Sequence, residues 1–276
     1  MIKDILANLS VTKDGGPSGD YAVSVASALQ AHLTGIAFIY DPVVPLEGTG
    51  YIPAEVIESQ EADNETAAKT AIKKFLVTTD RAGISADPLT ISASFAAAGD
   101  RFARMARRFD LAVVGQAQPE TSTLDEVIGE TTLFESGRPV IFVPYIQKAP
   151  FKLDNVMVCW DGSRPAARAI GDAMPLLVKA GGVEIVIVTN ERGKQDEIEG
   201  ADMGQHLARH GVKVDVHRIP GGDIDIADAL LSHAADSGTD FIVMGGYGHS
   251  RFREFVLGGV THSIFRSMTV PVLMSH

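Results

Sequence analysis

Two stretches of this chain end a short apolar run in the same way, and that similarity constrains the fold more than any other feature of the sequence. The stretches are FDLAVVGQAQ, from Phe109, and TDFIVMGGYG, from Thr239. In each, an Asp stands directly before a short apolar run, and glycine ends the run. Later in both come a Pro and a second apolar run, GRPVIFVP and TVPVLMS. Self-similarity of this kind is typical of repeated folding units. The sequence therefore predicts two domains, residues 1–147 and 152–276, with a linker at Lys148–Pro150.

Within each copy, apolar runs alternate with helical stretches, which indicates βαβ units and a parallel sheet. Runs such as VEIVIV and FIVMG are apolar throughout, as in strands that are covered on both faces. In the first copy we expect strands near 3–9, 34–40, 86–92, 110–115 and 139–143, and helices near 18–31, 55–81, 96–108 and 122–136. In the second we expect strands near 154–160, 183–189, 212–218, 240–245 and 270–274, and helices near 164–179, 196–210, 224–237 and 254–267. The predicted fold is α/β, with two tandem doubly wound parallel sheets of five strands each, in the order 3-2-1-4-5, flanked by helices.

The charge of the chain argues against two classes of partner. Among 276 residues, 24 Lys and Arg face 35 Asp and Glu, and the net charge of −11 works against nonspecific binding to nucleic acid or to an anionic membrane. No apolar run approaches the roughly 18 residues of a membrane span, and MIKDILANLS lacks the pattern of a signal peptide. We expect a cytoplasmic protein that binds neither nucleic acid nor membrane.

The only cysteine, Cys159, lies in the apolar run VMVCW. One cysteine cannot form an intramolecular disulfide or a cysteine-based metal site. We interpret Cys159 as a small buried hydrophobic residue and not as a nucleophile.

The glycine-marked strand exits of the second copy predict a binding crevice. In a doubly wound sheet, ligands bind outside the carboxyl ends of the strands where the winding reverses. Asp161-Gly162-Ser163 and Gly245-Gly246-Tyr247-Gly248 follow the two strands expected there. Glycine lets backbone N–H groups approach a phosphate closely, and a helix beginning after Arg253 would add its positive end. In the alternative interpretation, Gly245 and Gly246 form a tight turn, and Gly258-Gly259 ends or kinks a helix.

The spacing of Gly245, Gly248 and Gly258 is G-x2-G-x9-G. This spacing resembles the nucleotide loop of the universal stress protein family, whose ATP-binding members have Ser or Thr after the third glycine. VMVCWDGSRPAARAI resembles the first strand and helix of the family, and the last forty or so residues, from ADSGTDFIVMGG onward, resemble its C-terminal third. Over nearly its whole length, the chain resembles a tandem member of this family.

The resemblance implies that the second copy binds ATP, and it leaves open a companion Mg²⁺ ion. It implies that Asp161 and the backbone near Val188 receive adenine, while the glycine loop surrounds ribose and phosphates. The residues that it assigns to the nucleotide are Asp161, Gly162, Ser163, Val188, Met244, Gly245, Gly248, His249, Ser250, Gly258, Gly259, Val260 and Thr261. Gly259 stands where the family has Ser or Thr, so a hydroxyl contact is lost there.

The first copy departs from the pattern. Ser10 stands where the second copy has Asp161, and Gln118 replaces the second glycine. The next residue, Pro119, has no N–H to donate. Glycine returns at position 129, followed by Glu130, whose charge would repel phosphate. We predict that the first copy has the fold without the nucleotide site.

The histidines give no clear metal or catalytic site. His206 and His210 lie four apart on an expected helix, but no third ligand is evident. His249 and His262 flank the glycine loop, and no Asp or Glu is clearly placed to orient either ring. We therefore predict neither a metal site nor a catalytic residue.

Together these features favour a stress-related sensor or regulatory protein that binds ATP in its second copy and hydrolyses it slowly at most. The competing hypothesis is a nucleotide-independent interaction protein, in which the excursion Asp41–Pro53 or a cleft between the copies holds an apolar ligand or a protein partner. An adenylyl-transferring enzyme of the same layered fold would need a catalytic cluster that the sequence lacks. The terminal runs PVIFVP and VPVLMS are apolar and lie at sheet edges, so we expect the copies to pair within the chain as a pseudo-dimer, with a further homodimer left open.

Overall fold

The computed structural model of the chain describes residues 1–12, 15–42, 53–118, 123–189, 199–221, 224–246 and 259–276. The elements of the first half are β1 (Asp4–Asn8), α1 (Ser18–Leu29), β2 (His32–Tyr40), α2 (Ala54–Ala82), β3 (Ala86–Ala93), α3 (Phe95–Ala106), β4 (Leu111–Gly115), α4 (Thr123–Glu135) and β5 (Val140–Val143). Those of the second half are β6 (Asn155–Cys159), α5 (Arg164–Leu177), β7 (Gly182–Thr189), α6 (Glu199–Arg209), β8 (Val214–Pro220), α7 (Ile226–Asp236), β9 (Phe241–Gly245), α8 (Gly259–Ser267) and β10 (Val272–Ser275). Each expected helix and strand is present. The expected starts of α4, α6 and α8 fall outside the described residues.

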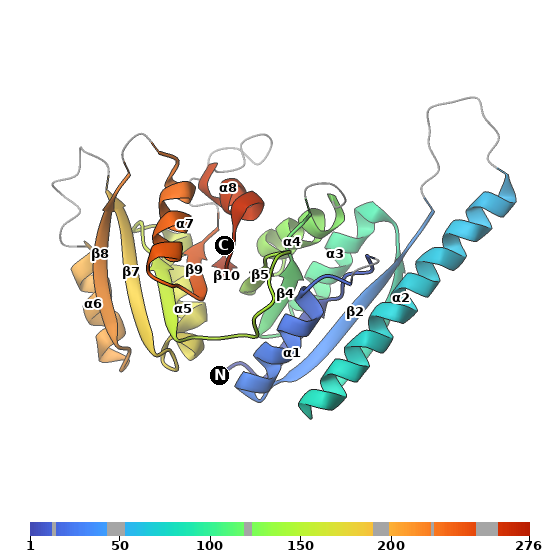
Figure 1. Cartoon of the computed structure of the whole chain (residues 1–276), viewed down its shortest axis with the longest axis horizontal. Helices are drawn as coiled ribbons and strands as arrows, with labels where there is room; N and C mark the ends of the chain where they lie inside the picture. Colours follow the sequence, from blue (N-terminus) through green and yellow to red (C-terminus); the bar gives the residue numbers. More distant parts are fainter. Residues whose placement is uncertain (13–14, 43–52, 119–122, 190–198, 222–223, 247–258) are drawn as a thin grey trace.

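The strands form one sheet of ten, in the order β3-β2-β1-β4-β5-β10-β9-β6-β7-β8. Each half has the predicted order 3-2-1-4-5 (Figure 1). At the centre, β10 pairs with β5 in antiparallel register, with Leu273 opposite Ile141. The prediction that the two apolar terminal strands pair within the chain is confirmed, and the pairing joins the two predicted sheets into one mixed sheet.

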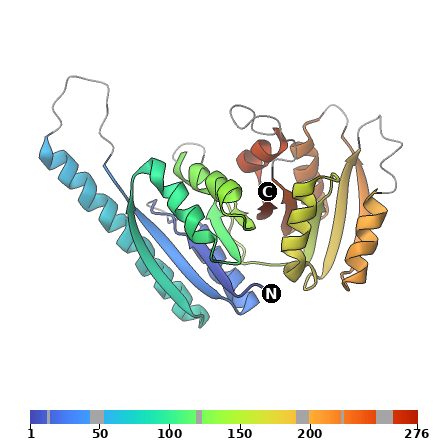
Figure 2. The same cartoon turned by 180° about the vertical axis from the view of Figure 1, so that it is seen from behind.

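Helices cover both faces of this sheet. The buried side chains of α1, α2, α5 and α6 belong to one hydrophobic cluster, and those of α3, α4, α7 and α8 belong to another. Because the sheet twists strongly, α1 and α2 lie in front of the first half in Figure 1 while α5 and α6 lie behind the second, and Figure 2 shows the reverse. The helices of the two halves therefore share two continuous layers.

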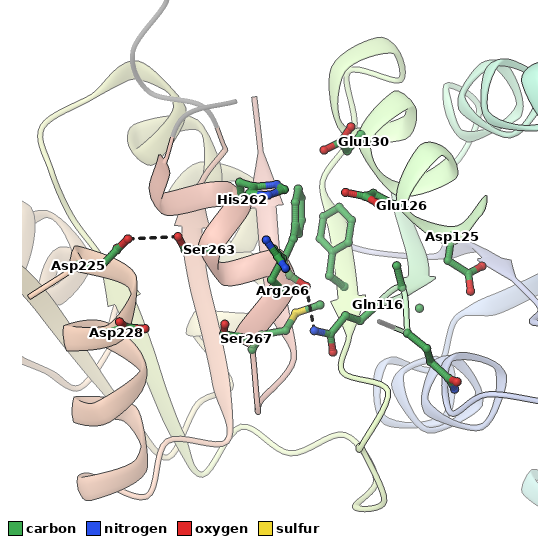
Figure 3. A pocket seen from close by; sticks show the side chains of 16 residues that line it. Gln116, Asp125, Glu126, Glu130, Asp225, Asp228, His262, Ser263, Arg266 and Ser267 are labelled. Atoms are coloured by element: carbon green, nitrogen blue, oxygen red, sulfur yellow. Dashed lines mark hydrogen bonds between the residues drawn. The ribbon is translucent and has the colours of Figure 1, made fainter. Parts of the chain in front are cut away.

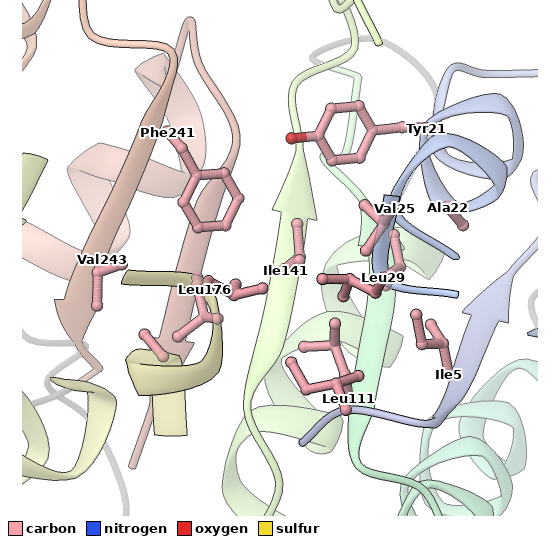
Figure 4. Close-up of a cluster of buried hydrophobic side chains, with 14 of the residues drawn as sticks. Ile5, Tyr21, Ala22, Val25, Leu29, Leu111, Ile141, Leu176, Phe241 and Val243 are labelled. Atoms are coloured by element: carbon pink, nitrogen blue, oxygen red, sulfur yellow. The ribbon is translucent and has the colours of Figure 1, made fainter. Parts of the chain in front are cut away.

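The core continues from one half into the other (Figure 4). Ile141 of β5 and Phe241 of β9 are fully buried in the same cluster. Phe151, in the connection between the halves, meets the rings of Tyr21 and Phe241 edge-on, at centroid distances of 6.0 and 5.6 Å. Because these aromatic contacts join α1 to β9, the hydrophobic effect that stabilises each half also holds the two together.

The Asp that opens each repeated segment has a structural role. The Asp110 carboxylate accepts the backbone N–H of Lys3 at 2.7 Å, and the Asp240 carboxylate accepts those of Asp154 and Asn155 at 3.2 and 3.3 Å. Each Asp thus ties the start of the fourth strand of its half to the start of the first. Burial is the main cause that raises the pKa of Asp240 above its ordinary value.

The helix α2 is 29 residues long and lies against β2 and β3. Its Phe75 ring fits over Gly35 of β2, where an added Cβ would lie 2.8 Å from Phe75 Cζ. Among the helices that the structure describes, none combines the length and the apolar character needed to cross a membrane.

Candidate functional site

The predicted crevice of the second half lies between β6 and β9. These strands are parallel neighbours, with Val158 opposite Val243. Since β7 and β8 lie beyond β6 while β10 lies beyond β9, the winding reverses between them. Asp161 follows the carboxyl end of one strand and Gly245 closes the other. The structure therefore brings the two predicted strand exits together at the reversal point.

The exit of β6 presents a carboxylate to solvent. Asp161 is exposed, and its Oδ1 accepts the backbone N–H of Ser163 at 2.9 Å. Gly162 has a φ of 74°, a left-handed conformation that favours glycine. Ser163 caps α5, because its Oγ accepts the N–H of Ala166 at 3.2 Å. This turn fixes the position of the Asp161 carboxylate, whose second oxygen can accept a bond from an amine.

Cys159 stands two residues before Asp161. Burial raises the pKa of its thiol to about 12, and the negative charge of Asp161 adds to the effect. A thiol with this pKa is protonated near neutral pH and is a poor nucleophile. Cys159 is half-buried, and the raised pKa of its thiol agrees with the interpretation that it is not a nucleophile.

The exit of β9 is packed tightly on both sides. A Cβ added to Gly245 would lie 2.6 Å from the carbonyl carbon of Pro165 and closer still to Ala166 N, both in the first turn of α5. A Cβ added to Gly246 would lie 2.8 Å from Leu133 Cδ2, which belongs to α4 of the other half. These packing contacts are sufficient to explain why positions 245 and 246 are glycine, whereas the turn that the alternative interpretation places there continues outside the described residues.

The N–H of Gly246 is also engaged. It donates to Ser275 O at 2.8 Å, and Gly246 O accepts from His276 Nδ1 at 3.1 Å. A phosphate at this crevice would therefore need N–H groups from residues further along the chain.

The other residues assigned by the resemblance lie in several places. Val188 is half-buried on β7, Met244 is buried on β9, and on α8 Val260 is half-buried and Thr261 is buried. Gly259 is the first residue of α8, and among the described residues no atom lies within 4 Å of where its side chain would begin. Gly248, His249, Ser250 and Gly258 lie outside the described residues.

The corresponding crevice of the first half is nearly filled. The cavity lined by Ser10, Thr12 and Gln118 measures about 10 Å³. The hydroxyl groups of Ser10 and Thr12 lie 2.9 Å apart and bond to each other. A volume of this size holds about one water molecule.

A larger cavity of about 930 Å³ lies at the junction of the two halves (Figure 3). Its walls come from α4 and the end of β4 in the first half, and from α7, α8 and the residue before α7 in the second. The acidic residues that line it are Asp125, Glu126, Glu130, Asp225 and Asp228. None of the residues assigned to the nucleotide is in its described lining. A cleft between the copies is therefore present, and its acidic lining does not suit an apolar ligand.

Hydrogen bonds hold the walls of this cavity in place. Gln116 is buried, donates from Nε2 to Phe265 O at 2.8 Å and accepts the Tyr145 N–H at 3.1 Å. Asp225 caps α7 by accepting the Ala227 N–H at 2.8 Å. Its other oxygen accepts the hydroxyl of Ser263 at 3.2 Å. The Gln116 bond crosses from one half to the other, so it fixes α8 against the first half.

The sequence shows no Asp or Glu clearly placed to orient His262, but the structure brings two glutamates close to it. Glu126, Glu130 and His262 each offer a ligand atom, and these atoms lie within 4.8 Å of one another. One signal was visible in the sequence, two glutamates four apart on an expected helix, but the histidine lies in the other copy. By contrast, His206 and His210 are exposed, with ring centroids 4.8 Å apart, as on a solvated helix face.

Known proteins resemble this chain in fold over its whole length and in sequence over part of it. The model of the universal stress protein family matches residues 188–276. Over 90 residues, 32% of this chain, the sequence is 32% identical to Universal stress protein Slr1230 of Synechocystis sp. (strain ATCC 27184 / PCC 6803 / Kazusa). The aligned part spans 30% of the length of that relative.

Solved structures match over almost the full length. A universal stress protein from Archaeoglobus fulgidus DSM 4304 is similar with a TM-score of 0.73 and 17% identity, covering 99% of this chain and 97% of that one. The functionally unknown protein PA1789 from Pseudomonas aeruginosa PAO1 is similar with a TM-score of 0.64 and 14% identity, covering 99% and 92%. Residues 188–276 therefore belong to the universal stress protein family, and the whole chain has the fold of a tandem universal stress protein.

Proposed function

We propose that this protein binds ATP in its second half and acts in the cytoplasm as a stress-related sensor or regulatory protein. The observation that carries the proposal is the placement of Asp161 and Gly245 at the ends of neighbouring parallel strands, where the winding reverses. The G-x2-G-x9-G spacing that begins at Gly245 supports the same site.

The described residues fit an adenine nucleotide in part. The exposed Asp161 carboxylate can accept a hydrogen bond from the exocyclic amine of adenine. Val188 lies next to the carboxyl end of β7, at the same edge of the sheet. Gly259 begins α8, so the N-terminal N–H groups of that helix suit a phosphate. In this proposal the remaining phosphate contacts come from the segment 247–258, which includes Gly248, His249, Ser250 and Gly258.

We propose that one nucleotide binds per chain. The cavity of about 10 Å³ beside Ser10 is far smaller than the roughly 300 Å³ of a small-molecule pocket. The sequence after Gly245 has no Gly-Lys-Ser/Thr as in a P-loop, and it suggests no general base for the site. We therefore infer a binding protein whose ATP hydrolysis is slow at most, and a companion Mg²⁺ would serve to neutralise the phosphates.

Titration calorimetry of the full-length protein with ATP and Mg²⁺ tests the proposal. The only tryptophan, Trp160, precedes Asp161, so its fluorescence gives a second readout of binding. We expect one site per chain and loss of binding in Gly248→Val. The matched control is Gln118→Val, at the corresponding position of the first half, which should bind ATP as the unaltered chain does.

Three results would contradict this assignment. Two sites per chain, or binding that survives Gly248→Val, would mean that the nucleotide sits elsewhere. An absence of binding to ATP would favour the competing hypothesis of a nucleotide-independent interaction protein. In that case, the ligand or protein partner of this interaction protein would have to suit the acidic cavity between the halves.

A further inference from the structure

We propose that Glu126, Glu130 and His262 bind a divalent transition-metal ion, such as Zn²⁺, at the junction between the two halves. The proposal is independent of nucleotide binding, because none of these residues is assigned to the ATP site.

The first observation is the position of the three side chains. Glu126 and Glu130 are one turn apart on α4, so both project from the same side of that helix. His262 comes from α8 of the other half, and Figure 3 shows its ring turned toward the two carboxylates across the cavity. One ligand atom from each residue lies within 4.8 Å of the other two.

The second observation concerns the histidine itself. Nδ1 of His262 is buried and has no hydrogen-bond partner among the described residues. A buried ring nitrogen without a partner is unfavourable, and coordination of a metal ion by Nδ1 would satisfy it.

The charge of the cavity also favours a cation. Five carboxylates line it, those of Asp125, Glu126, Glu130, Asp225 and Asp228, and Arg266 is the one Lys or Arg in the described lining. Like charges gathered in a partly enclosed space repel one another, although Asp125 accepts a hydrogen bond from Asn8 Nδ2 and Asp225 accepts one from Ser263. A doubly charged ion held by two of them reduces that repulsion.

The types of ligand select the kind of metal. Imidazole suits Zn²⁺ and its neighbours in the first transition row, whereas Mg²⁺ and Ca²⁺ prefer oxygen ligands alone. Zn²⁺ binds nitrogen and oxygen at about 2.0–2.2 Å, which separates its ligand atoms by roughly 3.3 Å. The three atoms must therefore approach one another by rotation of the two Glu side chains. The 930 Å³ cavity leaves room for water at the remaining coordination position.

Such an ion would join the halves. The two carboxylates belong to the first half and the imidazole to the second, so binding would add a link beside the Gln116 bond to Phe265 O. Because only the folded, docked chain brings the three ligands together, the metal should stabilise that state.

The test is a Zn²⁺ titration of the full-length protein, freed of metal with EDTA, in competition with a chromophoric chelator and without nucleotide. We expect one site per chain, with a Kd at least 10-fold higher in Glu130→Gln and in His262→Asn. Asp228→Asn, in the same cavity, and His210→Asn, on the surface, are matched controls that should keep the Kd within about twofold. Gly248→Val should also bind Zn²⁺ normally, which separates this site from the nucleotide site.

Two further measurements keep the proposal falsifiable if a variant does not fold. Glu126→Gln is a third ligand substitution, and Co²⁺ bound to the unaltered protein should give the visible absorption of a site with nitrogen and oxygen ligands. Equal binding by ligand and control variants would overturn the proposal. So would weak binding by the unaltered chain, or displacement of Zn²⁺ by equimolar Mg²⁺.

Discussion

Gly246 of the second half lies directly against Leu133 of the first. A Cβ at position 246 would lie 2.8 Å from Leu133 Cδ2, and Leu133 is 2% exposed. The missing side chain of one half therefore makes room for a core residue of the other.

Gly246→Ala should lower the free energy of unfolding by about 1–3 kcal/mol, because it overpacks this contact. Leu133→Ala alone should lower it by about 2–5 kcal/mol, since it leaves a cavity. Urea unfolding of the single and double variants measures the coupling between them. The double variant should be more stable than the sum of the single effects, whereas strict additivity would show that the two residues do not compete for space.

Gly245 and Gly259 should respond in opposite ways to alanine. At position 245 the new Cβ would meet backbone atoms of Pro165 and Ala166, which cannot rotate away, so we expect a loss of about 3 kcal/mol or more. At position 259 no atom of the described residues lies within 4 Å, so stability should change by less than about 0.5 kcal/mol. Thermal and urea unfolding check both. Equal tolerance of alanine at the two positions would refute the packing explanation of Gly245.

Gly259→Ser tests the proposed nucleotide site. The new hydroxyl restores the group that the universal stress protein pattern has after its third glycine. One added hydrogen bond to phosphate should tighten ATP binding about two- to tenfold. Calorimetry measures the effect, with Gly259→Ala as the control that adds a carbon and no hydroxyl. Equal affinities in the two variants would show that no phosphate lies at this position.

Gln116→Ala should destabilise the junction between the halves. The substitution leaves the Phe265 carbonyl and the Tyr145 N–H without the partner that Gln116 gives them, at a cost of about 1–3 kcal/mol. Gln147, whose side chain bonds only to Ala149 O among the interactions described, is the control, and Gln147→Ala should change stability by less than about 0.5 kcal/mol. Urea unfolding of Gln116→Ala and Gln147→Ala measures the free energy of unfolding of each variant. A result in which both variants match the unaltered chain would contradict a structural role for Gln116.

The thiol of Cys159 should react slowly and should make stability depend on pH. Its pKa is about 12 in the folded chain against an ordinary 9.0, so at pH 9 roughly one folded thiol in a thousand is ionised against half of the unfolded ones. Alkylation at pH 9 should be at least about 100-fold slower in the folded protein than in guanidinium.

The sign of the pH effect follows from the raised pKa. The folded state holds the proton more tightly, so the stability contributed by this group is full below pH 9 and is lost as the pH rises toward 12. The difference in stability between the unaltered chain and Cys159→Ser should therefore shrink over that range. A constant difference, or fast labelling of the folded protein, would argue against a buried thiol.

The fold could be predicted from the sequence because its signals are local. Apolar runs of strand length, alternating with helical stretches, located every element, and the apolar terminal runs correctly indicated that β5 and β10 pair. The repeated Asp was visible as a motif, but its role needed the structure, because Asp240 bonds to the backbone at Asn155, far away in the sequence.

The candidate site was only partly predictable, because composition does not reveal why a residue is glycine. Gly245 and Gly246 suggested a phosphate cradle, yet the atoms that exclude a side chain there belong to Pro165 and Leu133. The partners of His262 were missed for a similar reason. Glu126 and Glu130 reach it only because the halves fold onto each other, and no local pattern encodes that approach.

The joined sheet also determines how the molecule can meet its own copies. Its outer margins are β3 and β8, whose residues are mostly exposed and which include Pro88 and Pro220. Proline offers no N–H to a further strand, and charged residues such as Asp87 and Arg218 on these strands hinder edge-to-edge addition. The apolar edge strands β5 and β10 already pair with each other at the centre of the sheet. The sheet therefore cannot readily gain strands at β3 or β8, and a larger assembly would have to form through the helices that cover its faces.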